Sequence, residues 1–210
     1  MNITIIGASA GVGLDTVKRA LERGHTVKTL SRSKINLPEN NRLKMQQGSA
    51  TNRSDLEKSI ENADAVIVAI GTGSSTKATT LFSETARLLT AIQSKYNTSI
   101  PFIILTGFGA GESSNYVGFF GKLIFKFILK DIYVDKTKME KIITSSDMNW
   151  EIVRPGMLKN NSLTEKYRIE IKLYRNIKPT SINRADVADF MVKQAENPTL
   201  LKKCVSIFNK

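Results

Sequence analysis

The sequence is poor in the residues from which covalent cross-links, metal sites and hydrolytic triads are built. Cys204 is its single cysteine, which excludes a disulfide within the chain and any metal site that needs two thiolates. His25 is its single histidine and lies in a short turn between Arg23 and Thr26, where a structural or solvent-facing role is expected. A Ser-His-Asp triad or a histidine-rich metal cluster is therefore excluded, and we predict no metal site.

Acidic residues are scarce relative to basic ones: 31 Lys and Arg stand against 19 Asp and Glu, a formal net charge of +12. The positive charge is dispersed, and neither an aromatic-interleaved RNA motif nor zinc-finger spacing is present. We therefore expect no nucleic-acid partner and interpret the charge as attraction for anionic small ligands, a dinucleotide included. A chain of 210 residues suits one α/β domain spanning 1–210. Because a core strand starts right after Met1, we expect no signal peptide and a cytoplasmic location.

A long uninterrupted hydrophobic run is also missing. The most apolar stretch, 117–134, is broken by Lys122, Lys126, Lys130 and Asp131, so it is not a transmembrane span. The lysines recur every four residues and would form one stripe on a helix. A buried helix with one solvated edge is the first interpretation, and a membrane-surface helix or a protein interface is the alternative. The sequence predicts no particular oligomeric state.

The first 34 residues carry the strongest motif. A β-branched run at 3–6 leads into a glycine-rich turn, a helical apolar pattern and a second strand at 26–30. Glycines between strand and helix allow a tight reversal and a close approach of a phosphate, while the helix N-terminus favours an anion. A tight turn without a ligand is the alternative. The turn predicts a pyrophosphate site made by Gly7, Ser9, Ala10, Gly11, Val12 and Gly13.

The end of the second strand indicates which dinucleotide is bound. NAD sites usually place Asp or Glu there to hold the ribose hydroxyls. This sequence has Ser31, Arg32 and Ser33 instead, followed by Lys34. Hydroxyls and cations suit a 2′-phosphate, so we predict NADP(H), with Arg32 as the main phosphate partner. The alternative is that Arg32 is only a solvated surface cation.

Two further strand ends supply candidate cofactor contacts, since the carboxyl ends of parallel strands face the ligand. Ser49 and Ala50 follow the third strand and would line an adenine slot or form a plain connecting loop. Gly71, Thr72 and Gly73 follow the fourth, where glycines allow the backbone to run against a ribose or diphosphate; an ordinary turn is the alternative.

The last two strand ends are expected to hold the nicotinamide. Thr106 and Gly107 follow one strand, and Pro155, Gly156 and Met157 follow its expected neighbour. Pro155 and Met157 would supply apolar walls, and Gly156 would let the backbone lie beside a flat ring. Thr106 is the predicted catalytic residue, because its hydroxyl is the best placed to meet a substrate. It could equally be a hydroxyl satisfied within the protein.

Two segments are candidates to close over this site. One is the apolar helix expected at 119–129. The other is the polar, irregular stretch 160–178, in which 169–173 has a strand-like pattern. A last helix capped by Asn183 and a final strand at 205–208 complete the predicted chain.

Taken in order, these motifs resemble the atypical short-chain dehydrogenase/reductases, in the NAD(P)H-binding branch that includes NmrA-like proteins and biliverdin reductase B, also called flavin reductase. The resemblance is carried by Gly7–Gly13, Arg32, Gly71–Gly73, Thr106–Gly111, Glu140, Trp150–Leu158 and Arg184–Ala188. It implies a single Rossmann-type domain with a doubly wound parallel sheet. It also implies hydride transfer from NADPH to a small conjugated acceptor of flavin, quinone or bilin type, or else a non-catalytic NADP(H)-binding redox sensor.

One departure from the wider family concerns the proton donor. The better-known short-chain dehydrogenases use Tyr-x-x-x-Lys, in which the lysine lowers the pKa of the tyrosine. Tyr133 would need a lysine at 137, where the sequence has Thr137. Tyr174 and Lys178 have the right spacing but lie beyond the Pro155–Gly156 turn, in the wrong part of the fold. An acceptor that takes hydride directly and a proton from water tolerates the missing pair.

Overall fold

The computed structural model describes residues 1–73, 75–96, 98–118 and 129–210. Eight strands form one sheet in the order β3-β2-β1-β4-β5-β6-β10-β8, and all neighbours are parallel except β8, which runs antiparallel to β10. This confirms the predicted doubly wound sheet of Rossmann type. The strands are β1 (Asn2–Ile6), β2 (Thr26–Ser31), β3 (Leu43–Gln47), β4 (Ala65–Val68), β5 (Pro101–Leu105), β6 (Asn149–Pro155), β8 (Tyr167–Glu170) and β10 (Lys203–Asn209).

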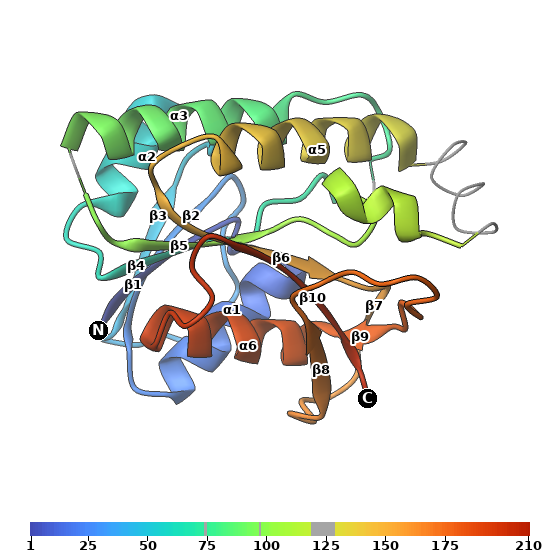
Figure 1. Cartoon of the computed structure of the whole chain (residues 1–210). Helices are drawn as coiled ribbons and strands as arrows, with labels where there is room; N and C mark the ends of the chain where they lie inside the picture. The colour runs from blue at the N-terminus through green and yellow to red at the C-terminus, as the bar shows by residue number, and fades with distance from the viewer. Residues whose placement is uncertain (74, 97, 119–128) are drawn as a thin grey trace.

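Helices cover both faces of the sheet, as Figure 1 shows. α1 (Gly11–Glu22) and α6 (Arg184–Glu196) lie on one face, and α2 (Arg53–Ile60), α3 (Leu81–Tyr96) and α5 (Lys130–Thr144) lie on the other. A 3₁₀ turn, η1 (Gly111–Tyr116), follows β5, and the short strands β7 (Leu158–Lys159) and β9 (Ile182–Asn183) pair in parallel outside the main sheet. This layering leaves the carboxyl ends of the parallel strands at one common edge.

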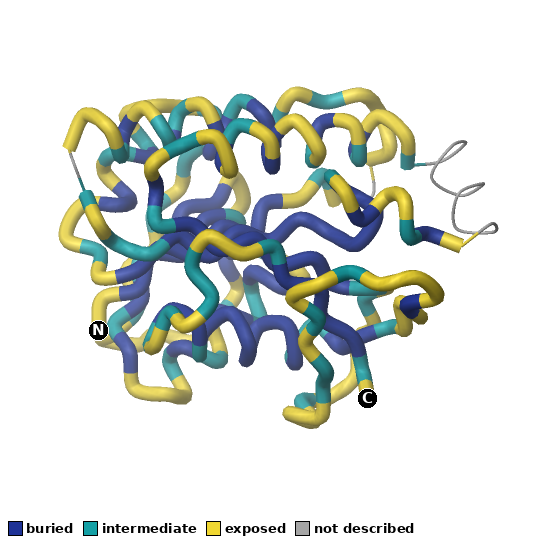
Figure 2. The backbone as a smooth tube through the Cα atoms, viewed as in Figure 1, coloured by how far each residue is buried: buried dark blue, intermediate teal, exposed yellow. Residues whose placement is uncertain are grey.

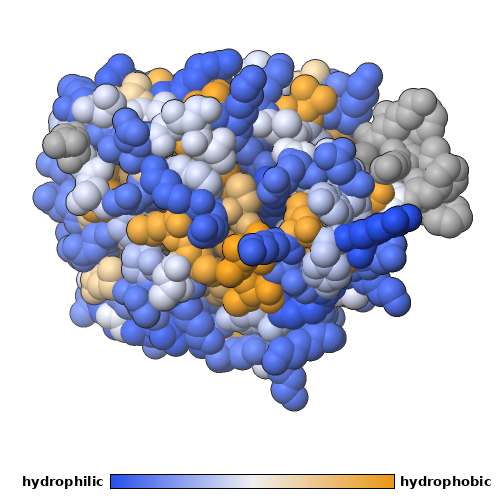
Figure 3. All heavy atoms as spheres, viewed as in Figure 1, coloured by the Kyte–Doolittle hydropathy of each residue, from blue (hydrophilic) through white to orange (hydrophobic). Residues whose placement is uncertain are grey.

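The central strands form because their side chains are apolar on both faces. Ile3, Ile5 and Ile6 of β1 are completely buried, and so is every residue of β4. Such continuous β-branched runs are typical of parallel strands that are covered by helices on both sides. Figure 2 shows the sheet as a buried layer between the helices: α3 and α5 expose their outer sides, whereas α6 is largely buried. On the face drawn in Figure 3, hydrophobic side chains gather between these layers, where the sheet reaches the surface.

The polar stretch after β6 differs from the sequence prediction. The strand expected at 169–173 is β8, Tyr167–Glu170, and it adds antiparallel to β10 at the sheet edge. Its start is set by its pairing with β10 rather than by its own pattern, since Asn209 lies opposite Tyr167 and Ser206 opposite Glu170. The last strand, expected at 205–208, is correspondingly longer, because β8 and β6 pair along its two sides.

Two buried carboxylates of α6 hold this stretch on the protein. Asp186 accepts hydrogen bonds from the Thr164 amide (2.7 Å), the Thr164 hydroxyl (3.0 Å) and the Glu165 amide (2.8 Å). Asp189 accepts from the Tyr167 hydroxyl at 2.9 Å and pairs with Arg19 of α1. Asn183 occupies the N-cap position of α6, but its side chain makes no capping hydrogen bond to the helix amides. Its side-chain amide donates to the carboxylate of Asp186 instead. The segment after β7 is therefore anchored to the first two turns of α6.

The apolar helix expected at 117–134 falls largely outside the described residues, as does the helix expected at 119–129. Of the described residues in that stretch, 130–134 open α5. Across the ranges that the structure describes, none of the helices combines the length and the hydrophobicity that a membrane crossing needs.

Candidate functional site

The glycine turn joins β1 to α1, as the sequence predicts, and two of its glycines are sterically required. Gly7 has φ +89°, and a Cβ there would lie 2.6 Å from the carbonyl oxygen of Ala69. A Cβ on Gly13 would lie 2.0 Å from the carbonyl oxygen of Gly7. Ala10 occupies the N-cap of α1 and offers no side-chain acceptor to the first amides. The turn therefore presents a helix N-terminus whose amides and dipole suit an anion.

A cation from the far end of the chain lies over this turn. The Nε of Arg184, the first residue of α6, lies 3.6 Å from the point that a Cβ on Gly11 would occupy. Arg184 is half-buried and donates to Asn160, and within the described part of the chain it forms no ion pair with a carboxylate. Burial raises the pKa of the nearby Asp15, while Lys18 and Arg184 oppose that rise. Sequence reasoning missed Arg184 as a site residue, because it is distant in sequence from the glycines.

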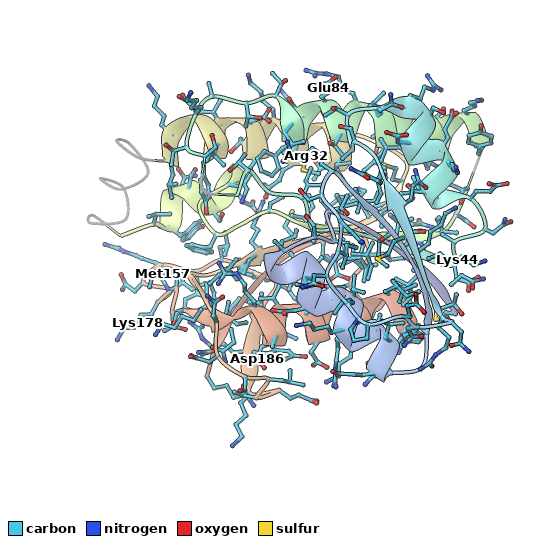
Figure 4. The ribbon with its side chains drawn as sticks, turned by 180° about the vertical axis from the view of Figure 1, so that it is seen from behind. Arg32, Lys44, Glu84, Met157, Lys178 and Asp186 are labelled. Atoms are coloured by element: carbon cyan, nitrogen blue, oxygen red, sulfur yellow. The ribbon has the colours of Figure 1, made fainter. Side chains whose placement is uncertain are left out.

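The loop after β2 exposes its cationic residues. The Ser31 hydroxyl is buried and donates to the carbonyl of Ser33 at 2.8 Å, and Gln47 donates to the carbonyl of Arg32 at 3.0 Å. The side chains of Arg32, Ser33 and Lys34 are exposed; Arg32 is labelled in Figure 4. The backbone of this loop is thus held in place while Arg32 stays available to a ligand.

The loop after β3 is held by hydrogen bonds, whereas the glycine-rich edge after β4 is open. Ser49 donates from its amide to Asp55 at 2.8 Å, and its hydroxyl lies 2.9 Å from that of Thr51. Ala50 is buried and accepts from Thr85, so the contacts of Ser49 and Ala50 are those of a well-ordered connecting loop. The edge at Gly71–Gly73 is open: a Cβ on Gly71 or Gly73 would meet no described atom within 4 Å.

At the end of β5, the Thr106 hydroxyl donates to the carboxylate of Glu140 at 2.7 Å and is almost fully buried. Glu140 also accepts two hydrogen bonds from Arg154, at 3.0 and 2.8 Å. A third Arg154 nitrogen contacts Glu112 at 3.2 Å. The Thr106 hydroxyl is therefore satisfied within the protein, the second of the two interpretations that the sequence allows. Its expected catalytic role stays a prediction.

Two proton-bearing side chains that the sequence analysis did not select lie beside Gly107. The Lys136 ammonium donates to the Thr106 carbonyl at 2.7 Å, and the Tyr133 hydroxyl lies 2.9 Å from where a Cβ on Gly107 would be. Burial lowers the pKa of Lys136 to about 8, against the opposing charge of Glu140. Burial, reinforced by that charge, raises the pKa of Tyr133 to about 12.

The signal for these two residues in the sequence is a lysine three residues after a tyrosine, one residue fewer than in Tyr-x-x-x-Lys. Tyr133 and Lys136 are three residues apart, which places them on one side of α5. Thr137, at the position expected for a lysine, instead accepts from the Gly111 amide at 3.0 Å and donates to the Tyr133 carbonyl.

The strands that carry Thr106 and Pro155 lie side by side, as predicted. β5 and β6 pair in parallel, and the Phe108 amide donates to the Pro155 carbonyl at 2.9 Å. Pro155 is buried, whereas Met157 is 71% exposed. A Cβ on Gly156 would lie 2.0 Å from the carbonyl oxygen of Thr180, so this glycine allows the 171–181 segment to pack against the strand end.

The described residues also line a cavity of about 480 Å³ away from these strand ends. It lies between the C-terminal ends of α2 and α3, with Ile60, Ile92 and Ile100 among its lining residues. None of the predicted site residues contributes to it. The candidate site is therefore the strand-end edge, where the glycine turn, Arg32, Gly107 and Gly156 follow β1, β2, β5 and β6.

Solved structures with the same fold cover the whole chain. An oxidoreductase from Lactococcus lactis has a TM-score of 0.81 at 20% identity, covering 100% of this chain and 91% of its own. A proposed NADH-flavin reductase from Streptococcus pneumoniae has 0.80 at 21%, covering 100% of both. An anaerobilin reductase from Escherichia coli O157:H7 has 0.77 at 21%, covering 100% of this chain and 97% of its own.

The model of a family described as NAD(P)H-binding matches residues 7–198, from the first glycine of the turn to the end of α6. The matched range includes the glycine turn, the loop after β2 and both strand ends at the expected nicotinamide position. This confirms the family-level resemblance seen in the sequence. The chain belongs to this NAD(P)H-binding family.

Proposed function

We propose that this protein is an NADPH-dependent reductase that transfers hydride to a small conjugated acceptor of flavin, quinone or bilin type. The observation that carries the proposal is one sheet edge that combines a dinucleotide turn with two proton-bearing groups, Lys136 and Tyr133, beside Gly107. Structural neighbours described as an NADH-flavin reductase and an anaerobilin reductase support a reductase. The acceptor class rests on the sequence resemblance and on these neighbours together.

NADPH rather than NADH is proposed from the charge at the end of β2. Arg32 and Lys34 are exposed there, and no Asp or Glu is present between positions 31 and 38 to hold a ribose diol. A guanidinium matches a phosphate with two parallel hydrogen bonds. A neighbour from Veillonella parvula, with a TM-score of 0.83 at 16% identity, was solved in complex with NADP.

In this proposal, different residues along the strand-end edge bind different parts of NADPH and the acceptor. The glycine turn and Arg184 would hold the diphosphate, and Pro155 and Gly156 would border the nicotinamide. A bound NADPH supplies the hydride. Lys136, a cation at neutral pH given a pKa of about 8, would stabilise negative charge that develops on the acceptor, and water would deliver the proton. Through its hydrogen bond to the Thr106 carbonyl, Lys136 also holds the loop that borders the ring.

The direct test is oxidation of NADPH, followed by absorbance, with FMN, menadione and a bilin as acceptors. Turnover is expected with at least one acceptor, and Lys136→Ala should lower kcat by about a hundredfold, the lower end of what one positioned group contributes by stabilising developing charge. Lys138→Ala is the matched control, because Lys138 is exposed on the same helix. Equal rates in both variants would show that the chemistry does not depend on this lysine.

A non-catalytic NADP(H) sensor is the second candidate. It is favoured by the engagement of the Thr106 hydroxyl with Glu140 and by the missing Tyr-x-x-x-Lys pair. Tight NADPH binding measured by calorimetry, combined with no oxidation of NADPH by any of these acceptors, would support the sensor and contradict the reductase.

A further inference from the structure

The segment between β6 and β9 has a marked excess of positive charge. Residues 157–181 contain six Lys and Arg but only two Glu. Both carboxylates are already paired: Glu165 with Arg19 and Lys193, and Glu170 with Arg168. Within the described residues the other cations of the segment form no ion pair, and all are exposed: Lys159, Lys166, Lys172, Arg175 and Lys178.

Three of these cations lie on the loop that packs against the expected nicotinamide end. The loop 171–181 carries Lys172, Arg175 and Lys178, and its Ile177 is buried in a cluster with Phe108. The Phe108 amide is bonded to the end of β6, and Gly156 leaves room for the loop backbone at Thr180. Met157 and Lys178 lie toward the same end of the molecule in Figure 4, while Lys44 lies toward the other.

The loop packs on an apolar cluster and carries exposed apolar side chains of its own. Phe108, Val117, Ile177 and Phe208 form a small buried cluster under the loop, and Leu173 packs against it. Met157, Ile171 and Tyr174 remain 71%, 47% and 48% exposed. Apolar and aromatic contacts suit the ring of a conjugated molecule, and unpaired cations beside them suit an anion attached to that ring.

We propose that the acceptor carries an anionic substituent, a phosphate, sulfonate or carboxylate, that is bound by Lys172, Arg175 and Lys178 while its ring lies toward the ends of β5 and β6. The inference rests on the proposed reductase function and narrows its substrate class to anionic conjugated acceptors. Attraction by exposed cations falls with salt, because the Debye length shrinks from about 10 Å at 0.1 M to about 3 Å at 1 M. Salt dependence is therefore part of the expected behaviour.

The test compares acceptors that share a ring and differ in charge. FMN and riboflavin differ by a phosphate, and 1,4-naphthoquinone-2-sulfonate and 1,4-naphthoquinone differ by a sulfonate. In each pair the anionic member is expected to have a kcat/KM about tenfold higher at low salt, mainly through KM, because exposed charge contacts contribute modestly each. The ratio should approach one in about 1 M NaCl.

The variant Lys172→Ala/Arg175→Ala/Lys178→Ala should reduce both ratios to near one while leaving the rates with the neutral acceptors unchanged. Binding of FMN and riboflavin to the NADP⁺-loaded protein, measured by flavin fluorescence, should lose the same preference. The control variant Lys44→Ala/Lys141→Ala/Lys203→Ala removes three exposed cations outside the loop. It should retain the preference, which separates the local effect from a change in net charge.

The possible failures are distinguishable. Equal kcat/KM for the charged and neutral members of both pairs, with good turnover, would overturn this inference and leave the reductase intact. No turnover with any acceptor would overturn the reductase and this inference with it. Sedimentation of the protein with phosphatidylglycerol vesicles through the same three cations, without discrimination between FMN and riboflavin, would assign the loop to a lipid surface and contradict an anionic acceptor.

Discussion

Glu151, in the middle of β6, carries a buried carboxyl group, and its effect on the free energy of unfolding can be worked out from the structure. It is completely buried, and neither carboxylate oxygen has a hydrogen-bond partner among the described residues. Its side chain lies on the α1 and α6 side of the sheet, since Val153 two residues on belongs to that core. Burial raises the pKa of Glu151 from 4.5 to about 8.

The difference between the pKa of Glu151 in the folded state and in the unfolded state sets the sign and the size of its effect on stability. A carboxyl whose pKa is higher in the folded state is protonated and uncharged at low pH, so its cost appears as the pH rises. Each pH unit between the two pKa values corresponds to about 1.4 kcal/mol, so the interval from 4.5 to about 8 amounts to about 5 kcal/mol lost by pH 8 and above. At pH 5, half a unit above the lower pKa, the loss is still below about 1 kcal/mol.

Glu151→Gln replaces the carboxyl with an amide of similar shape that stays uncharged at every pH. The free energy of unfolding of the variant should lie within about 1 kcal/mol of the wild type at pH 5 and exceed it by several kcal/mol at pH 9. Urea unfolding at pH 5, 7 and 9 measures this, with the fluorescence of Trp150, the single tryptophan, and circular dichroism as independent probes. Glu39→Gln, at an exposed position, is the control and should show no such trend.

A difference between variant and wild type that stays constant from pH 5 to pH 9 would refute this reasoning. It would mean that the carboxyl titrates normally, through contacts with water or a cation. Other titrating groups do not confuse the comparison, because they are shared by the two proteins and cancel in the difference.

The other predictions concern the strand-end edge. Arg184→Gln should weaken the binding of NADPH and of NADH equally, by about tenfold for one charged hydrogen-bonding contact, whereas Arg32→Ala should weaken the binding of NADPH alone. Calorimetry with both dinucleotides measures this. Equal losses of affinity in Arg32→Ala would contradict the 2′-phosphate assignment. Gly156→Val should abolish turnover, because the added side chain clashes with the Thr180 carbonyl at the expected nicotinamide end. Binding of adenosine 2′,5′-bisphosphate, measured by calorimetry, should survive. Turnover at the wild-type rate would place the nicotinamide elsewhere. Glu140→Ala should cost about 3–5 kcal/mol in denaturant unfolding, because it removes the buried partner of the Arg154 charge and leaves only the exposed carboxylate of Glu112. Ala at Glu112 should cost less than about 1 kcal/mol.

The doubly wound parallel sheet and the glycine turn between its first strand and helix could be predicted from local patterns in the sequence. Continuous β-branched runs identify parallel strands, and the glycine turn after residue 6 identifies the edge where a ligand belongs. Because all parallel strands end at that edge, the side-by-side placement of Thr106 and Pro155 also followed.

Contacts between distant elements could not be predicted in this way. The bond from Thr106 to Glu140 depends on how α5 is rotated against the sheet, which neither residue's neighbours reveal. The placement of Arg184 over Gly11 depends on the packing of α6 beside α1. The boundaries of β8 depend on pairing with β10, so a four-residue antiparallel edge strand left only a weak and displaced local signal.

The anchoring of the segment after β7 has a consequence for how this architecture diversifies. The segment is fastened at its beginning by Asp186, in its middle by the pairing of β8 with β10, and at its end by the pairing of β9 with β7. Between the last two anchors, loop 171–181 contributes one buried residue, Ile177, to the interior. Substitutions at its exposed positions thus leave the sheet and the dinucleotide turn untouched. Under the proposed role of this loop, a change of acceptor would therefore need only a short stretch of surface sequence and no change in the sheet.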